Sequence, residues 1–349
     1  MENLKTKKII AQATDPIYIG TGGFTIGRVD NTIVRDPITK IPKIPGSSIA
    51  GTWRYYMALE LISEIKDKKP NFKSDECKNK ENLSEKFEQC SWEKDEPSKE
   101  WQKWKYNKLA RIECAGQDDA SDNSIEKAEE KSQKNNKYGH CGHCIVCKAF
   151  GFSKKDLSNQ GMLFFSDLNI LFFPVYTRLG VRWITSKRIL ENAKLLKEEF
   201  EEKEVVVISE NEEDNSGFIN LGWLNLPYEK KAIKIDLSNI SQITIDDIII
   251  VPDSLISQII NSNLEVRTSV SIDPITGAAK EGALFTSEAI PRGTIFYGEV
   301  RGFKREGDSS LPELNLVFEA LEDSKQYFNT LGIGGMTTRG FGRLEVKLQ

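Results

Sequence analysis

A long polar stretch divides this chain and limits where a hydrophobic core can form. From about Asp67 to Tyr138 the sequence is dominated by Lys, Glu, Asp, Asn and Ser, and it is interrupted by the segment 91–114 with its aromatic and aliphatic residues. A segment so poor in apolar residues cannot bury enough surface to fold alone. We therefore interpret 67–147 as a charged, partly helical insertion in a body formed by 1–66 and 148–349. The alternative is a solvated excursion without a role.

The body alternates between strand and helix patterns. We predict a first strand within 7–20, a helix over 47–65 with Ser47 or Ser48 as its N-cap, and a buried strand over 162–175. A helix over 185–203, a strand and short helix within 231–263, and a long hairpin with its tip at 273–282 follow. A helix, a glycine-rich loop and a last strand occupy 320–348. This order is typical of an α+β fold of the ferredoxin or RNA-recognition type, and hairpin signals outnumber the crossovers of a doubly wound parallel sheet.

The charge balance excludes a globally basic nucleic-acid binder but not local binding of a polyanion. The net charge is -4, and the acidic residues gather at 75–130 and 199–214. Basic residues stand beside glycine-rich turns instead: Arg28, Arg35, Lys40, Lys43, Arg54, Arg339 and Arg343. No apolar run has the roughly 18 to 20 residues of a membrane span, and the start lacks a signal-peptide core. We expect a soluble cytoplasmic protein without a membrane partner.

Three cysteines at successive C-x-x-C spacings indicate a metal. Cys141, Cys144 and Cys147 fall within seven residues, which suits the wrapping of one tetrahedral ion better than free buried thiols or a redox pair. We predict structural zinc with Cys114 as the fourth ligand and His140 as its rival. The site would attach the insertion to the body.

Two segments, one near each end of the chain, resemble a pair of sequence motifs that occur together in a known family. "KIPKIPGSSIAGTWR" (40–54) and "GGMTTRGFGRLEV" (334–346) resemble motifs of the RAMP superfamily, the RNA-binding subunits of CRISPR effector complexes. The stretches 161–190 and 266–300 are similar to the backbone subunit of type III complexes, especially the Cmr-type (III-B) target-RNA nuclease subunit. The resemblance runs from about residue 9 to the end and leaves only the charged insertion uncovered.

The resemblance implies a modified RNA-recognition palm with a hairpin thumb at about 263–300, which polymerises along a guide RNA beside other effector subunits. It also implies that Asp30 matches an aspartate needed for cleavage of target RNA with a divalent cation such as Mg or Mn. Two positions depart from the family pattern. Ala50 stands where a basic residue is frequent, and Tyr18 where a histidine is frequent.

Small and basic residues at both ends of the chain form the predicted RNA track. Glycines bring backbone close to phosphate, hydroxyls donate, and a helix N-terminus attracts anions. The candidate RNA-binding residues are Lys43, Gly46, Ser47, Ser48, Gly51, Arg54, Arg267, Gly334, Gly335 and Arg339. The terminal glycine loop matches no nucleotide-binding fingerprint, and taken alone it favours a tight loop packed under a sheet over an RNA contact.

Three functions remain open from the sequence. The first is an endoribonuclease subunit that cuts guide-paired RNA. The second is a non-catalytic scaffold for the guide RNA, in which Asp30 only shapes a loop. The third is a zinc-dependent protein-interaction module without an RNA role.

Overall fold

The computed structural model describes residues 3–22, 29–65, 97–116, 140–153, 158–197, 200, 205–208, 216–238, 240 and 243–349. Most of the predicted insertion, at 67–96 and 117–139, therefore lies outside the described residues. The chain forms two compact units, which we describe separately. Unit 1 comprises Met1–Lys7, Ser47–Phe165 and Val300–Tyr327, and unit 2 comprises Lys8–Gly46, Ser166–Glu299 and Phe328–Gln349.

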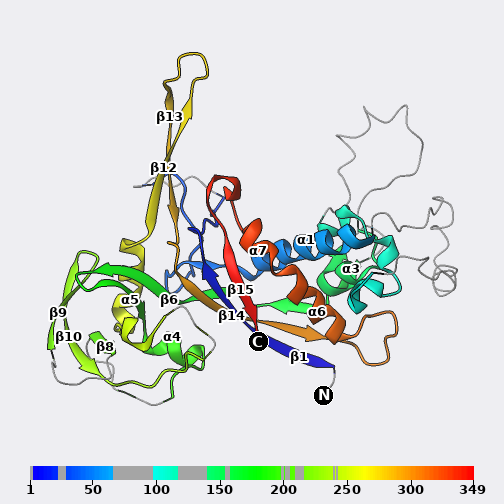
Figure 1. Cartoon of the computed structure of the whole chain (residues 1–349), viewed down its shortest axis with the longest axis horizontal. Helices are drawn as coiled ribbons and strands as arrows, with labels where there is room; N and C mark the ends of the chain where they lie inside the picture. Colours follow the sequence, from blue (N-terminus) through cyan, green and yellow to red (C-terminus); the bar gives the residue numbers. More distant parts are fainter. Residues whose placement is uncertain are drawn as a thin grey trace. The chain divides into compact units, whose positions relative to one another are not determined.

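A mixed sheet organises unit 2, with strands in the order β15-β1-β14-β6-β7-β11-β8-β10-β9 (Figure 1). Its strands are β1 (Leu4–Ala13), β6 (Leu168–Thr177), β7 (Gly180–Thr185), β8 (Val205–Ile208), β9 (Ser216–Leu221), β10 (Leu224–Lys231), β11 (Ile248–Ile250), β14 (Ile295–Phe303) and β15 (Leu344–Leu348). The first residues of β1, up to Lys7, and the last residues of β14, from Val300, belong to unit 1. The short β2 (Lys43–Ile44) pairs with β6. Pairing is parallel between β7 and β11 and between β8 and β10. The antiparallel pairs include β6 with β7 and with β14.

The element order confirms the α+β class. Along the chain, β1, helix α1 (Gly46–Ile65), β6, β14, helix α6 (Leu314–Ser324) and β15 occur in this order, with other elements between them. The corresponding four strands are neighbours in the order β15-β1-β14-β6. A β-α-β-β-α-β chain with this strand order is consistent with a ferredoxin-like fold. Strands β7 to β11 extend the sheet beyond β6.

Buried apolar side chains form the core around the centre of the sheet in unit 2. Phe172, Phe173, Ile249, Phe296 and Leu344 have no exposed surface, and burial of such side chains contributes about 1.5–3 kcal/mol each. The helices of this unit are α4 (Lys187–Asn192), α5 (Asp253–Ser262) and α7 (Tyr327–Thr330), the last of which begins at the unit boundary, and the 3₁₀ helices are η5 (Ile245–Asp247) and η6 (Thr337–Arg339).

Two sequence predictions differ from the structure. The strand predicted over 162–175 is two strands, β5 (Leu163–Phe165) and β6, separated by Ser166 and Asp167. The helix predicted over 185–203 ends at Asn192. Leu196 forms a bridge with Ile235 instead, because a tertiary pairing overrides a local periodicity.

Helix α1 supplies the core of unit 1. Ile49, Trp53, Met57 and Leu61 are at most 1% exposed, and their spacing of four residues places them on one face of the helix. The remaining elements are α3 (Ile145–Phe150), α6, η2 (Glu100–Lys103), η3 (Asn107–Leu109), η4 (Ile112–Ala115), β3 (Gly151–Ser153), β4 (Ser158–Gln160) and β5. Strand β5 pairs with the end of β14.

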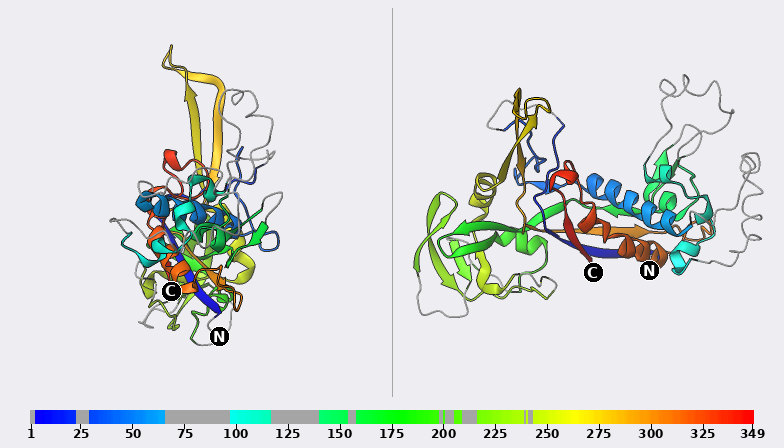
Figure 2. Two further views of the ribbon diagram at one scale, coloured as in Figure 1. Left: turned by 90° about the vertical axis from the view of Figure 1, so that its right-hand side faces the viewer. Right: turned by 45° about the horizontal axis from the view of Figure 1, so that its top comes forward.

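The predicted hairpin is present in unit 2. Strand β12 (Glu265–Ile272) pairs antiparallel with β13 (Ala279–Ala289), and the two project as a ribbon beyond the sheet of that unit (Figures 1 and 2). In the turn, Asp273 accepts hydrogen bonds from the backbone N–H groups of Ile275 and Thr276. None of the described helices is both long and apolar enough to span a membrane.

Candidate nucleic-acid interface and metal centre

The candidate catalytic residue Asp30 lies beside strand β13. Its Oδ2 accepts hydrogen bonds from the backbone N–H of Thr286 at 2.7 Å and from the Thr286 hydroxyl at 2.9 Å. The backbone N–H of Asp30 donates in return to Thr286 Oγ1 at 3.1 Å. These bonds, that of the Thr286 backbone first, lower the pKa of the Asp30 carboxyl. Asp30 therefore presents an exposed, ionised carboxylate near the base of the hairpin.

The segment that follows Asp30 is joined to the same strand. The backbone N–H of Asn31 donates to the carbonyl oxygen of Thr286 at 3.0 Å, and the N–H of Glu288 donates to the carbonyl oxygen of Asn31 at 3.0 Å. Arg35 forms an ion pair with Glu288 at 2.7 Å. Backbone bonds and one ion pair thus hold this segment against β13.

A carboxylate closes the start of helix α1, where we predicted a phosphate site. The Gly46 N–H donates to Asp167 Oδ1 at 2.8 Å, and Lys43 Nζ lies 2.7 Å from Asp167 Oδ2 and 3.3 Å from Asp36 Oδ2. The bond to Asp167 is the first cause that raises the pKa of Lys43. Burial opposes ionisation of Asp167, but its bonds to Lys43 and Gly46 lower its pKa.

This arrangement corrects the predicted N-cap. The helix begins at Gly46, so that Ser47 and Ser48 lie in its first turn, and a side chain distant in sequence replaces a local cap. Lys43 is engaged with two acidic side chains. Ser47 and Gly51 are exposed and Ser48 is half-buried, and a Cβ at Gly51 would meet nothing within 4 Å.

Arg54 points toward the cysteine region of unit 1. Its Nε donates to the carbonyl oxygen of Cys114 at 2.8 Å, and a terminal nitrogen lies 2.9 Å from His140 Nδ1. A guanidinium only donates, so Nδ1 of His140 accepts and its proton is on Nε2. His140 is 1% exposed. Arg54 thus links helix α1 to the segments that carry the cysteines.

The terminal glycine loop packs against the segment around Tyr18. The N–H of Gly335 donates to the carbonyl oxygen of Tyr18 at 3.0 Å. Gly334 has φ +82, and a Cβ there would lie 2.3 Å from the same oxygen. Close approach to the Tyr18 backbone accounts for Gly334, whereas a Cβ at Gly335 would lie 3.0 Å from a ring carbon of Tyr18. Arg339 is exposed, and the Arg267 guanidinium lies 4.7 Å from the ring centroid of Phe341.

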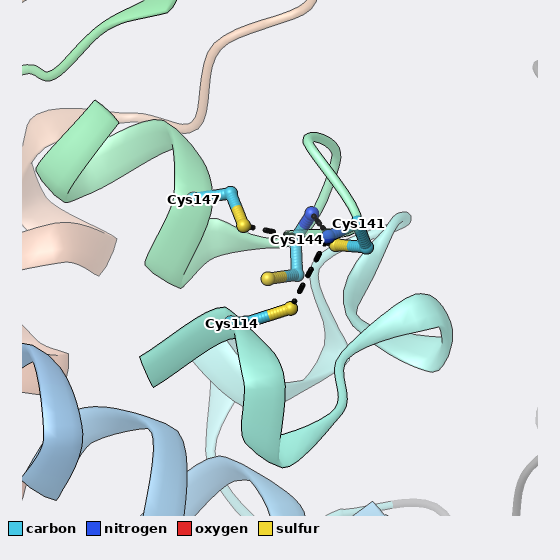
Figure 3. A group of neighbouring side chains, drawn as sticks. All are labelled: Cys114, Cys141, Cys144 and Cys147. Atoms are coloured by element: carbon cyan, nitrogen blue, oxygen red, sulfur yellow. Dashed lines mark hydrogen bonds between the residues drawn. The ribbon is translucent and has the colours of Figure 1, made fainter. Parts of the chain in front are cut away.

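Four cysteines converge in unit 1 (Figure 3). The Sγ atoms of Cys114, Cys141, Cys144 and Cys147 all lie within 4.8 Å of one another. Cys114 comes from η4, whereas the other three lie at the start of α3 and in the turn before it. Backbone N–H groups of His143 and Cys144 donate to Cys141 Sγ at 3.4 and 3.2 Å.

The donor set fits a tetrahedral metal. A Zn–S distance of about 2.3 Å corresponds to S–S separations of about 3.8 Å, and Cys141 and Cys147 are already 3.9 Å apart. Burial raises the pKa of Cys144, whereas hydrogen bonds from the other thiols, Cys114 first, lower the pKa of Cys147. Of the two rivals for the fourth position, Cys114 belongs to this cluster, and His140 directs its Nδ1 at Arg54.

The sequence did not single out Thr286 or Asp167. Thr286 is 256 positions from Asp30, and Asp167 is 121 positions from Gly46. Each lies in a strand-like stretch whose apolar residues dominate the pattern, so only the pairing of distant strands brings them to the site.

The chain is similar in sequence to two CRISPR endoribonucleases. It is 43% identical over 56 residues to the CRISPR system Cms endoribonuclease Csm3 of Methanothermobacter thermautotrophicus, which covers 16% of this chain and 23% of the relative. It is also 28% identical over 218 residues to the CRISPR system Cmr endoribonuclease Cmr4 of Pyrococcus furiosus. This alignment covers 56% of this chain and 72% of the relative. The chain thus covers about a quarter of the length of the Csm3 relative.

Solved structures of the same fold extend over the whole chain. A type III-B Cmr-beta complex bound to cognate target RNA contains a chain with a TM-score of 0.57 at 14% identity, with coverage of 99% of this chain and 97% of the other. Oligomeric Cmr4 from Pyrococcus furiosus gives 0.53 at 18% identity, with 99% and 98% covered. The model of the RAMP superfamily matches residues 11–345. The chain therefore belongs to the RAMP superfamily.

Proposed function

We propose that this chain is a backbone subunit of a type III CRISPR effector complex, and that it binds the guide RNA and cleaves guide-paired target RNA with Asp30. The observation that carries the proposal is the exposed, ionised carboxylate of Asp30 in a chain that matches the RAMP superfamily over residues 11–345. Relatives named as Cmr4 and Csm3 endoribonucleases support the reaction class. The Cmr complex bound to target RNA supports the substrate.

The chemistry follows from the state of this carboxylate. When a 2'-hydroxyl of RNA attacks the adjacent phosphate, its oxygen bonds to phosphorus while the bond from phosphorus to the 5'-oxygen breaks. The hydroxyl proton must be removed, the leaving 5'-oxygen must gain a proton, and negative charge on the phosphate must be stabilised. A carboxylate with a lowered pKa is a weak base at neutral pH. Asp30 therefore contributes more as a ligand for a divalent cation, Mg or Mn, than as a general base. One carboxylate suits Mg, which takes further ligands from water and substrate phosphate, and the bound cation would stabilise charge on the phosphate oxygens.

The second candidate is a guide-RNA scaffold without catalysis. The three hydrogen bonds between Asp30 and Thr286 favour it, because they also suit an aspartate that only fixes a loop. Both candidates assign the same guide RNA, the same effector subunits and the same contacts between copies of the chain. They differ only in what Asp30 does.

The RNA track of this proposal uses the exposed part of the predicted set. Ser47, Gly51 and Arg339 face solvent, and small residues on a helix surface allow close approach of a phosphodiester backbone. Lys43 and Gly46 contribute little to RNA binding as long as both are bonded to the Asp167 carboxylate. The β12–β13 hairpin is the thumb of this proposal, and the body and insertion keep the boundaries predicted from the sequence.

Zinc in the four-cysteine cluster is the structural part of the proposal. It would join the segment ending at Cys114 to helix α3, and folding would depend on it. Freshly purified, reduced protein is expected to contain one zinc per chain by elemental analysis, and Cys114→Ser is expected to lower that content. Protein without zinc that keeps its Tm would refute the assignment.

The test of catalysis is Asp30→Ala in the assembled complex with its guide. We expect loss of target-RNA cleavage with unchanged guide loading and target binding. Asp236→Asn is the matched control, since Asp236 also accepts a hydrogen bond from a backbone N–H, that of Ser238 at 3.1 Å, and also has a lowered pKa. Unchanged cleavage by Asp30→Ala would establish the scaffold instead.

A further inference from the structure

We propose that Thr286 is a positioning residue for target cleavage, which holds the Asp30 carboxylate by Oδ2 and thereby sets the direction of Oδ1. This inference rests on the proposed function of Asp30. It adds to that function a residue of the hairpin strand β13, far from Asp30 in the sequence.

The contact is reciprocal and uses three bonds between two residues. Thr286 donates its backbone N–H and its hydroxyl to one oxygen of Asp30, at 2.7 and 2.9 Å. The same hydroxyl oxygen accepts the backbone N–H of Asp30 at 3.1 Å. Both donors converge on Oδ2, so neither bond engages Oδ1. A carboxylate held in this way has a fixed plane, which an exposed aspartate held by no such bonds lacks.

Further contacts hold strand β13 against the segment that carries Asp30. Asn31 pairs with β13 through two backbone hydrogen bonds of 3.0 Å, one on each side of Ser287, and the side chain of Asn31 lies 3.3 Å from Ser287 Oγ. Arg35 adds the ion pair to Glu288. Hydrogen bonds and an ion pair thus join the strand to the segment carrying Asp30 on the C-terminal side of Thr286.

Fixing a carboxylate matters because reactive groups tolerate little displacement. A misplacement of about 1 Å can lower a rate about 100-fold. Residues that support a reactive group by hydrogen bonds keep it in productive geometry. The hydroxyl of Thr286 has this role for Asp30, and it joins the orientation of the carboxylate to the base of the hairpin.

Three variants test the inference in the assembled complex. Thr286→Val keeps the shape and removes the hydroxyl, and Thr286→Ser restores it. Thr268→Val is the matched control, because Thr268 is paired directly opposite Thr286 on β12, and paired residues share a face of the ribbon. Single-turnover cleavage at saturating target RNA separates the rate from target binding.

We expect Thr286→Val to lower the cleavage rate about 10- to 100-fold with unchanged target binding. Thr286→Ser is expected within about 3-fold of the unsubstituted chain, and Thr268→Val unchanged. Thr286→Val cutting at the full rate while Asp30→Ala abolishes cleavage would overturn the inference and leave the proposed function intact.

A second readout does not depend on activity. Because Thr286 Oγ1 accepts the Asp30 backbone N–H, hydrogen exchange of that amide should accelerate in Thr286→Val but not in Thr286→Ser or Thr268→Val. If Asp30→Ala still cleaves, the proposed function fails and the positioning role in cleavage fails with it, and this exchange measurement then tests only whether the Thr286 hydroxyl holds Asp30. Equal exchange at Asp30 in all three variants would refute it.

Discussion

The carboxylate of Asp167 is expected to stabilise the fold through two separable contacts at the start of helix α1. It accepts the Gly46 N–H at 2.8 Å and lies 2.7 Å from Lys43 Nζ. Asp167→Ala removes both contacts. Asp167→Asn keeps an acceptor for the amide, because Asn caps helices as well as Asp does, and loses only the charge.

The magnitudes follow from these contacts. Loss of a helix cap costs about 1 kcal/mol. The side chains of the ion pair are 17% and 38% exposed, so solvent screens their attraction, which contributes about 0.5 kcal/mol. Asp167→Ala should therefore lower the free energy of unfolding by about 1.5 kcal/mol, which corresponds to roughly 3–6 °C in Tm at about 2–4 °C per kcal/mol. Asp167→Asn should lower Tm by about 1–2 °C on the same scale.

Thermal unfolding followed by circular dichroism at pH 7 measures both variants. Glu345→Gln is the control, since it removes one negative charge from the exposed side of β15. At about 0.5 M salt the deficit of Asp167→Asn should shrink, because the ion pair is screened and the amide cap is not. A Tm for Asp167→Ala within about 1 °C of the unsubstituted chain, or equal losses for Ala and Asn, would refute the reasoning.

Three further predictions concern single residues. Gly334→Ala should cost about 1–3 kcal/mol more than Gly277→Ala, because both glycines have positive φ but only Gly334 would clash, at 2.3 Å from the Tyr18 carbonyl oxygen; urea unfolding that shows equal costs would contradict this. The hydrogen bond from the Thr39 backbone N–H is the first of several that lower the pKa of the Asp36 carboxyl from 3.8 to about 2. The stability contributed by ionised Asp36 is therefore present above pH 3.8 and is lost as the pH falls toward 2. Asp36→Asn should flatten this loss of stability with falling pH, and an unchanged acid-unfolding curve would refute it. Trp101→Phe removes the hydrogen bond of 2.7 Å from the indole N–H to the carboxylate of Asp323 on α6. The free energy of unfolding should fall by about 2–4 kcal/mol, and a loss of less than about 1 kcal/mol by calorimetry would contradict this.

Local signals predicted those parts of the fold that depend on periodicity. The apolar spacing of 47–65 predicts α1, the pattern around 273–282 predicts the hairpin, and both are present. The helix predicted over 185–203 is shorter because Leu196 pairs with Ile235. A partner contributed by another strand leaves no trace in the local pattern.

The site divides in the same way. Three of the four clustered cysteines lie within seven residues, and their C-x-x-C spacing indicates a metal site from the sequence. Cys114 was the preferred fourth member, but only the structure places its sulfur with the others and turns His140 toward Arg54. The glycines at 334 and 335 were recognisable as a tight loop, whereas their contact with Tyr18 was not.

The sequence by itself determined the α+β class, the hairpin, the cysteine motif and the resemblance to the RAMP superfamily. Each of these depends on local patterns of residues, such as periodicity, turn residues, cysteine spacing and short motifs. Only the tertiary structure decided which groups face Asp30 and which close the start of α1. Thr286 and Asp167 reach those places through strand pairing across more than a hundred positions. Hydrogen bonds act over about 3 Å in space without regard to distance along the chain, and for that reason the neighbours of the carboxylate were decided by the fold.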